Sequence, residues 1–198
     1  MKLLHSLGAN SVPVVSKGGK FTYAQSLSDV VTFLGLDVTV GPQLTMPELV
    51  DKLEIVFATA ERLWLQFPND RLDESLPSRN RPFRVLGHHI FRIPEAFVEV
   101  TEGDPLTAGK YAEKPPADMK TVEQITAYGR GVRDRFRTWW LKVEDVTGDQ
   151  LVPTYYGDQP ILEVLERTTW HAAQHVRQTA MLLEQFGIKP DRDRKSVV

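Results

Sequence analysis

The sequence predicts a mainly α-helical protein, an up-and-down-type four-helix bundle preceded by a small β-hairpin and a short helix. Apolar residues recur at helical spacing in four stretches of about twenty residues, and stretches rich in Pro and Gly separate them. The first forty residues differ, because short β-branched runs flank a Gly-Gly pair there. We therefore expect three parts: an N-terminal segment over 1–40, the bundle over 41–188 and a flexible tail over 189–198.

The N-terminal segment carries the signals of a hairpin followed by a helix. SVPVVS, at 11–16, is typical of a strand, the Gly pair at 18–19 of a tight turn, and KFTYAQ of a second strand. SLSDVVTFLGL predicts a helix that Ser26 or Ser28 caps and Gly35 ends. A unit this small cannot bury both faces of its sheet. We expect its open edge to pair with a second copy, which favours a homodimer.

Local signals mark where the four long helices begin and end. The helices are expected over 47–67, 83–100, 122–143 and 160–186. Pro47 suits a first turn, and Thr121 with Gln124 forms a capping-box pattern. Pro94 either kinks the second helix or breaks it into two pieces.

The connections between these helices are expected to be irregular. TEGDPLTAGKYAEKPPADMK separates the second helix from the third, and EDVTGDQLVPTYYGDQ separates the third from the fourth. Asp158 or Gln159 lies near the expected cap of the last helix. Loops of this length tend to be functional.

Composition excludes several classes of protein. The net charge is −2 and the pI about 6.2, so no global basic field favours a nucleic-acid partner. Apolar runs fall far short of the roughly 20 residues that a membrane span needs, and MKLLHSLGANSVPVV lacks the apolar region of a signal peptide. We expect a cytoplasmic protein. The chain has no cysteine, so any metal must be held by nitrogen and oxygen.

Two histidines lie one helical turn apart in TTWHAAQHVRQ. His171 and His175 share a helix face, so they could bind one ion together, although the spacing alone fits two ordinary packed histidines as well. Leu165, Ala172 and Leu182 lie along or beside the same face, which indicates that it points into the bundle. A buried imidazole nitrogen that has no partner costs about 1–3 kcal/mol of stability. One metal ion would provide a partner for His171 and for His175 at once.

A third ligand is expected from the adjacent pair His88 and His89. Neighbouring residues on a helix point about 100° apart, so only one of the two can join the site. His89 shares a face with Leu86 and Ile93, whereas the face of His88 includes Arg92. We therefore favour His89, with His88 as the alternative. Three imidazoles would leave coordination positions for water or a substrate, and the identity of the metal stays open.

The helix order and the histidines resemble those of the DinB/YfiT family. One His stands on the second helix, and H-x-x-x-H-x-x-Q stands on the fourth as His171-Ala-Ala-Gln-His175-Val-Arg-Gln178. The similarity covers about residues 45–187. It implies a zinc or nickel site at one end of the bundle, with His89 (or His88), His171 and His175 as ligands. It also implies a homodimer, and some similar proteins transfer a low-molecular-weight thiol such as bacillithiol or mycothiol.

Residues 1–36 resemble the second half of a glutaredoxin, from its Val-Pro strand to its last helix. The resemblance implies a cis Val12–Pro13 bond whose backbone lies beside a bound thiol. The half that carries Cys-x-x-Cys is absent, which excludes disulfide exchange by this chain.

Together these features favour an enzyme. The three-histidine metal would activate a thiol or water, for transfer to or hydrolysis of a small electrophile. The alternative is a non-catalytic protein of the same family, in which the metal is structural or a sensor and the bundle serves dimerisation or a stress response.

Overall fold

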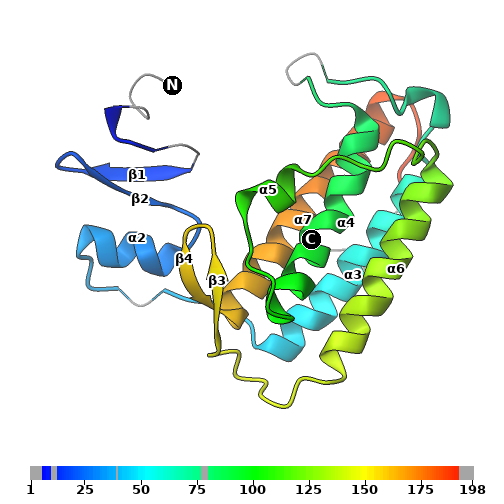
Figure 1. Cartoon of the computed structure of the whole chain (residues 1–198). Helices are drawn as coiled ribbons and strands as arrows, with labels where there is room; N and C mark the ends of the chain where they lie inside the picture. The colour runs from blue at the N-terminus through cyan, green and yellow to red at the C-terminus, as the bar shows by residue number, and fades with distance from the viewer. Residues whose placement is uncertain (1–5, 10–12, 39, 77–79, 192–198) are drawn as a thin grey trace.

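A computed structural model describes residues 6–9, 13–38, 40–76 and 80–191. The described part is mainly helical with a small N-terminal β-hairpin, as predicted. Four long helices lie side by side (Figure 1): α3 (Met46–Leu65), α4 (Phe83–Thr101), α6 (Val122–Trp140) and α7 (Ile161–Gln185). None of the helices in the described residues combines the length and the apolar sequence that a bilayer crossing requires.

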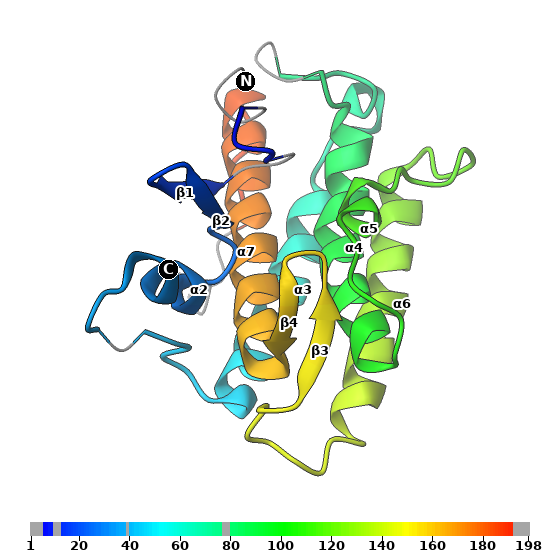
Figure 2. The ribbon, with the colours of Figure 1, turned by 60° about the vertical axis from the view of Figure 1, so that its left-hand side comes forward.

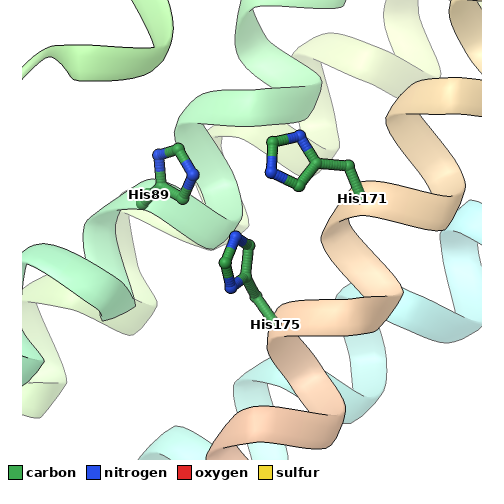
Figure 3. Close-up of side chains that lie close together, drawn as sticks. All are labelled: His89, His171 and His175. Atoms are coloured by element: carbon green, nitrogen blue, oxygen red, sulfur yellow. The ribbon is translucent and has the colours of Figure 1, made fainter. Parts of the chain in front are cut away.

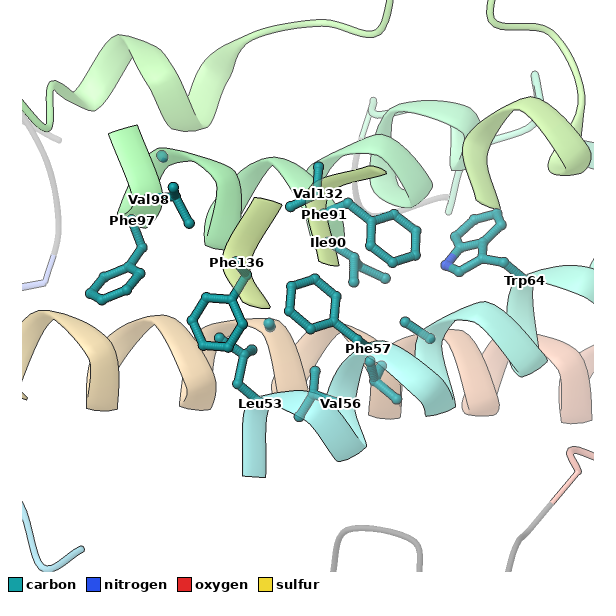
Figure 4. Packing of buried hydrophobic residues seen from close by; sticks show 14 of the residues in the cluster. Leu53, Val56, Phe57, Trp64, Ile90, Phe91, Phe97, Val98, Val132 and Phe136 are labelled. Carbon is teal, nitrogen blue, oxygen red and sulfur yellow. The ribbon is translucent and has the colours of Figure 1, made fainter. Parts of the chain in front are cut away.

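Buried apolar side chains fill the space between the four helices (Figure 4). Helix α3 packs on α6 and α7, and α4 packs on the same two helices. The ring of Phe136 on α6 lies 5.8 Å from that of Phe57 on α3 and 6.3 Å from that of Phe97 on α4. Each such side chain contributes about 1.5–3 kcal/mol by leaving water. This core fixes the faces that α4 and α7 present to each other.

The predicted helix starts are confirmed at α3 and α6. The backbone N–H of Thr45 donates to the Glu48 carboxylate (2.8 Å), and Pro47 lies in the first turn of α3. At α6, Thr121 accepts from the N–H of Gln124, whose side chain accepts in return from the N–H of Thr121 (3.1 Å). These reciprocal bonds satisfy amide groups that have no partner inside the helix.

Helix α4 continues through Pro94, so the alternative of two separate pieces is wrong. Pro94 removes one backbone hydrogen bond, which costs about 3 kcal/mol or more in a helix interior. Ile93 and Phe97, on either side of it, are fully buried in the described structure. Their packing offsets that cost and keeps both halves helical.

The N-terminal segment forms the hairpin and helix that its sequence predicts. Strands β1 (Val14–Lys17) and β2 (Lys20–Tyr23) pair antiparallel around the two glycines at 18–19, both at positive φ. Ser26, and not Ser28, caps α2 (Leu27–Leu34) by accepting from the N–H of Asp29. Gly35 ends the helix in the left-handed conformation, with φ 67°.

This segment lies beside α7 (Figure 2), and polar contacts attach it there. The hydroxyls of Ser26 and Ser28 each donate to the Glu163 carboxylate at 2.7 Å. The amide of Gln159 donates to Asp29 at 3.2 Å. None of the eight residues of α2, all of them described, is buried. The segment therefore forms a wall along α7 without joining the main core.

The two long connections contain regular structure that was not predicted. Helix α5 (Ala108–Ala112) lies in the first, and a hairpin of β3 (Leu151–Thr154) and β4 (Gly157–Pro160) lies in the second. Gln159 and Asp158 stand one and two residues before Pro160, the N-cap of α7, so they lie near the cap as expected, but they belong to β4 and do not cap the helix. A β-bridge between Leu106 and Thr154 ties the two connections together, a long-range contact that no local pattern shows. Residues 192–198 of the expected tail lie outside the described residues.

Candidate metal centre

Three histidines converge where α4 and α7 face each other (Figure 3). The ring centre of His89 lies 5.4 Å from that of His171 and 4.9 Å from that of His175. One nitrogen from each ring lies within 4.8 Å of the other two, so the group could hold a metal ion. Nitrogens bound tetrahedrally at about 2.1 Å would be about 3.4 Å apart, a separation that lies within this limit of 4.8 Å.

The helix period brings His89 to this group and turns His88 away. His88 stacks on Tyr128 of α6, with ring centres 4.9 Å apart and ring planes 15° apart. One residue along a helix rotates the side-chain direction by about 100°, which separates the two neighbours. The structure thus brings together His89, His171 and His175, and it leaves His88 packed between α4 and α6.

Two imidazoles of the group, those of His89 and His171, are held neutral. Burial lowers the pKa of His89 and of His171 to about 3, and the nearby ring of His175 adds to the effect in both cases. Arg81 lowers both pKa values further. Since only a neutral imidazole has a nitrogen lone pair for a metal, His89 and His171 have the protonation state that metal binding needs at neutral pH.

Hydrogen bonds orient two of the three rings. Nδ1 of His175 lies 3.0 Å from Oε1 of Gln178, which can only accept. The proton of His175 therefore belongs on Nδ1, leaving Nε2 as the metal-binding atom. A hydrogen bond to the backbone of Tyr111 holds His89. Such bonds to the second ring nitrogen are usual for metal-binding histidines. Gln178, the last residue of the H-x-x-x-H-x-x-Q motif, thus has the role of orienting His175.

The group lines an open groove of about 790 Å³. The other lining residues are Pro13, Arg81, Gln174, Arg177, Gln178 and Met181. Pro13, expected to contact a thiol, thus borders the same groove as the histidines. Val12 and its bond to Pro13 lie outside the described residues, so the expected cis bond does too.

Sequence reasoning missed three residues around the group. The ring of Tyr111, on α5, lies 5.7 Å from that of His171. Arg167 stacks over the same Tyr111, with its guanidinium carbon 5.6 Å from the ring centre. Arg167 precedes His171 by one turn, and that spacing could have indicated it. Tyr111 and Arg81 come from connections with no periodic pattern, so no sequence signal would have placed them here.

Comparison with protein-family models and with curated proteins finds no match for this chain. The DinB and glutaredoxin resemblances therefore rest on the quoted residues alone. What the site can do has to follow from its side chains: three imidazole nitrogen donors on two packed helices, at the wall of a groove wide enough for a small molecule.

Proposed function

We propose that this chain is a DinB-like four-helix-bundle protein that binds one zinc or nickel ion through His89, His171 and His175. In this proposal the site transfers a low-molecular-weight thiol to a small electrophile or hydrolyses such a molecule. The observation that carries the proposal is the convergence of three imidazoles on an open groove.

The donor set fits such an ion. Imidazole suits borderline metals such as zinc and nickel, whereas calcium and magnesium prefer oxygen ligands. Among the described residues that line the groove there is no Asp or Glu to complete the coordination. Three protein ligands are the usual number in catalytic zinc sites, where the remaining position takes water or substrate.

When bound, a divalent ion would lower the pKa of a coordinated thiol or water and so supply a nucleophile at neutral pH. The three histidines would hold the ion, and Gln178 would keep the proton of His175 on Nδ1. The Tyr111 ring, close to His171, would restrict water on that side. In thiol transfer, the sulfur lone pair forms the new C–S bond while the leaving group departs with its bonding electrons, and the thiol proton passes to solvent. In hydrolysis, a water oxygen takes the place of sulfur.

Metal content tests the first step. We would purify the protein without a histidine tag and measure bound metal by mass spectrometry for the wild type, His89→Ala and His171→Ala. His88→Ala is the matched control, because it removes a buried imidazole from the same helix outside the group. We expect one metal per chain in the wild type and the control, and loss in the other two. Wild-type protein that refuses added zinc and nickel would refute the proposal.

A second measurement separates catalysis from a structural metal. Cobalt-substituted protein would be titrated with 2-mercaptoethanol while its absorption spectrum is recorded. We expect a thiolate-to-cobalt charge-transfer band, because an open coordination position admits the thiol. A spectrum that the thiol leaves unchanged would favour the non-catalytic alternative.

We also propose that the chain forms a homodimer. Strands β1 and β2 make a two-stranded sheet, and the described residues add no third strand to it. Leu27 of α2 and Trp170 of α7, which are 70% and 64% exposed, line one pocket and are large apolar side chains that a second copy could cover. Sedimentation velocity tests the proposal, and a monomer at micromolar concentration would contradict it.

A further inference from the structure

The charged side chains that the structure describes in the lining of the histidine groove are two arginines. Arg81 lies just before α4, and Arg177 lies on α7 two residues after His175. No carboxylate is present among the described residues of the lining. The remaining polar groups of the wall are the amides of Gln174 and Gln178, which are neutral. The groove therefore presents a positive surface to anything that reaches the histidines.

A further arginine, Arg167, adds to this charge from one helical turn before His171 on α7. Arg167 lies among three tyrosine rings, and its polar contacts are the hydroxyls of Tyr111 (3.5 Å) and Tyr155 (3.1 Å) and the amide oxygen of Gln25. Among the described residues, no Asp or Glu forms an ion pair with Arg167 or Arg177. Arg167 and Arg177 thus place positive charge on α7 that no carboxylate of the described residues pairs with.

We propose that the groove takes a small organic acid, whose carboxylate binds Arg81 and Arg177 while its reacting end lies at the three histidines. This inference rests on the proposed function, because it names the class of molecule that the site would receive. For thiol transfer, either the thiol or the electrophile would carry the carboxylate.

Charge and shape both favour this class of ligand. A divalent ion on three neutral imidazoles keeps its full charge, and Arg81 adds another positive charge beside it. An anionic ligand would offset the positive charge of the ion and that of Arg81. The planar fork of a guanidinium matches the two oxygens of a carboxylate, and such charge-assisted pairs are stronger than neutral hydrogen bonds. Phosphate presents similar oxygens, so the experiment has to separate the two anions.

Calorimetric titration with succinate tests the proposal, with succinamide as the uncharged probe of the same shape and inorganic phosphate as the competing anion. Each probe is titrated into metal-free and zinc-loaded protein. Arg81→Gln and Arg177→Gln remove one charge each. Arg130→Gln is the control, because Arg130 pairs with Glu61 away from the groove.

We expect succinate to bind at least about tenfold more tightly than succinamide, and Arg81→Gln to lower that affinity by about tenfold. Arg177→Gln should cause a smaller loss, since its side chain is exposed. Arg130→Gln should bind like the wild type. Equal binding of succinate and succinamide would overturn the proposal, and so would wild-type affinity in both groove variants. Phosphate binding more tightly than succinate, with the same dependence on Arg81, would overturn the organic acid in favour of phosphate.

The metal-free titrations keep this result separate from the proposed function. If the protein refuses zinc but succinate still binds through Arg81, the metal chemistry fails and the anion site stands. If zinc binds to the wild type and to Arg81→Gln while succinate shows no preference over succinamide, the anion site fails and the metal centre stands.

Discussion

Lowering the pH from 7 to 5 should strongly destabilise the metal-free protein, because its buried histidines resist protonation. In the unfolded chain a histidine has a pKa near 6.5. In the folded chain burial lowers the pKa to about 3 for His89 and His171 and to about 4 for His88. Between these values the unfolded state binds more protons than the folded state. The free energy of unfolding therefore falls as the pH falls through 6.5, and it continues to fall toward the folded pKa values.

The size of the effect follows from the same values. Between pH 7 and pH 5 each of the three histidines lowers the free energy of unfolding by about 2 kcal/mol. Together they lower it by about 6 kcal/mol. That is comparable with the whole stability of many domains, which is about 5–15 kcal/mol. Between pH 6 and 5 the slope should approach about 4 kcal/mol per pH unit, because nearly three protons are taken up on unfolding.

Urea denaturation followed by circular dichroism, in EDTA and at several pH values from 7 to 5, measures this slope. His88→Phe is the informative variant, since a phenyl ring can keep the stacking on Tyr128. It should reduce the slope by about a third. A free energy of unfolding that stays constant between pH 6.5 and 5 would show that the histidines are not buried as described.

Two further predictions concern the helix contacts and the metal. A Cβ at Gly129 would come 2.5 Å from the ring of Phe91, so Gly129→Ala should destabilise the protein by about 1–3 kcal/mol in urea denaturation. Gly131→Ala, on the same helix with nothing within 4 Å, should stabilise it by about 0.5–1 kcal/mol, and equal effects would contradict the close contact. Zinc at 100 times its dissociation constant should add about 2.7 kcal/mol and raise Tm by about 5–11 °C in calorimetry. His171→Ala should lose this shift, and a shift that persists would place the zinc elsewhere.

Much of the candidate site could be predicted because helix geometry is periodic. The four-residue interval between His171 and His175 places both on one face wherever that helix lies. The apolar stripe of Leu86 and Ile93 favoured His89, the residue that the structure brings to the pair. Tyr111 could not be predicted, because its position depends on how a connection folds back over α4 and α7.

The sequence by itself determined the features that depend on residues a few positions apart. The turn at 18–19 follows from two glycines that accept positive φ, the start of α2 from the hydroxyl of Ser26, and the start of α6 from Thr121 and Gln124. The lack of cysteine likewise restricts any metal site to nitrogen and oxygen ligands.

Only the tertiary structure decided which residues from distant parts of the sequence lie close together. The hairpin of β3 and β4 pairs with the first connection at Leu106, and Arg81 joins Arg177 at one groove although 96 positions separate them in the numbering. Such contacts depend on which helix faces the core buries together, and a local pattern carries no information about its distant partners. The pairing of His171 with His175 is therefore local in origin, whereas the approach of His89 and the lining of one groove by Arg81 and Arg177 arise from the packing of α4 against α7.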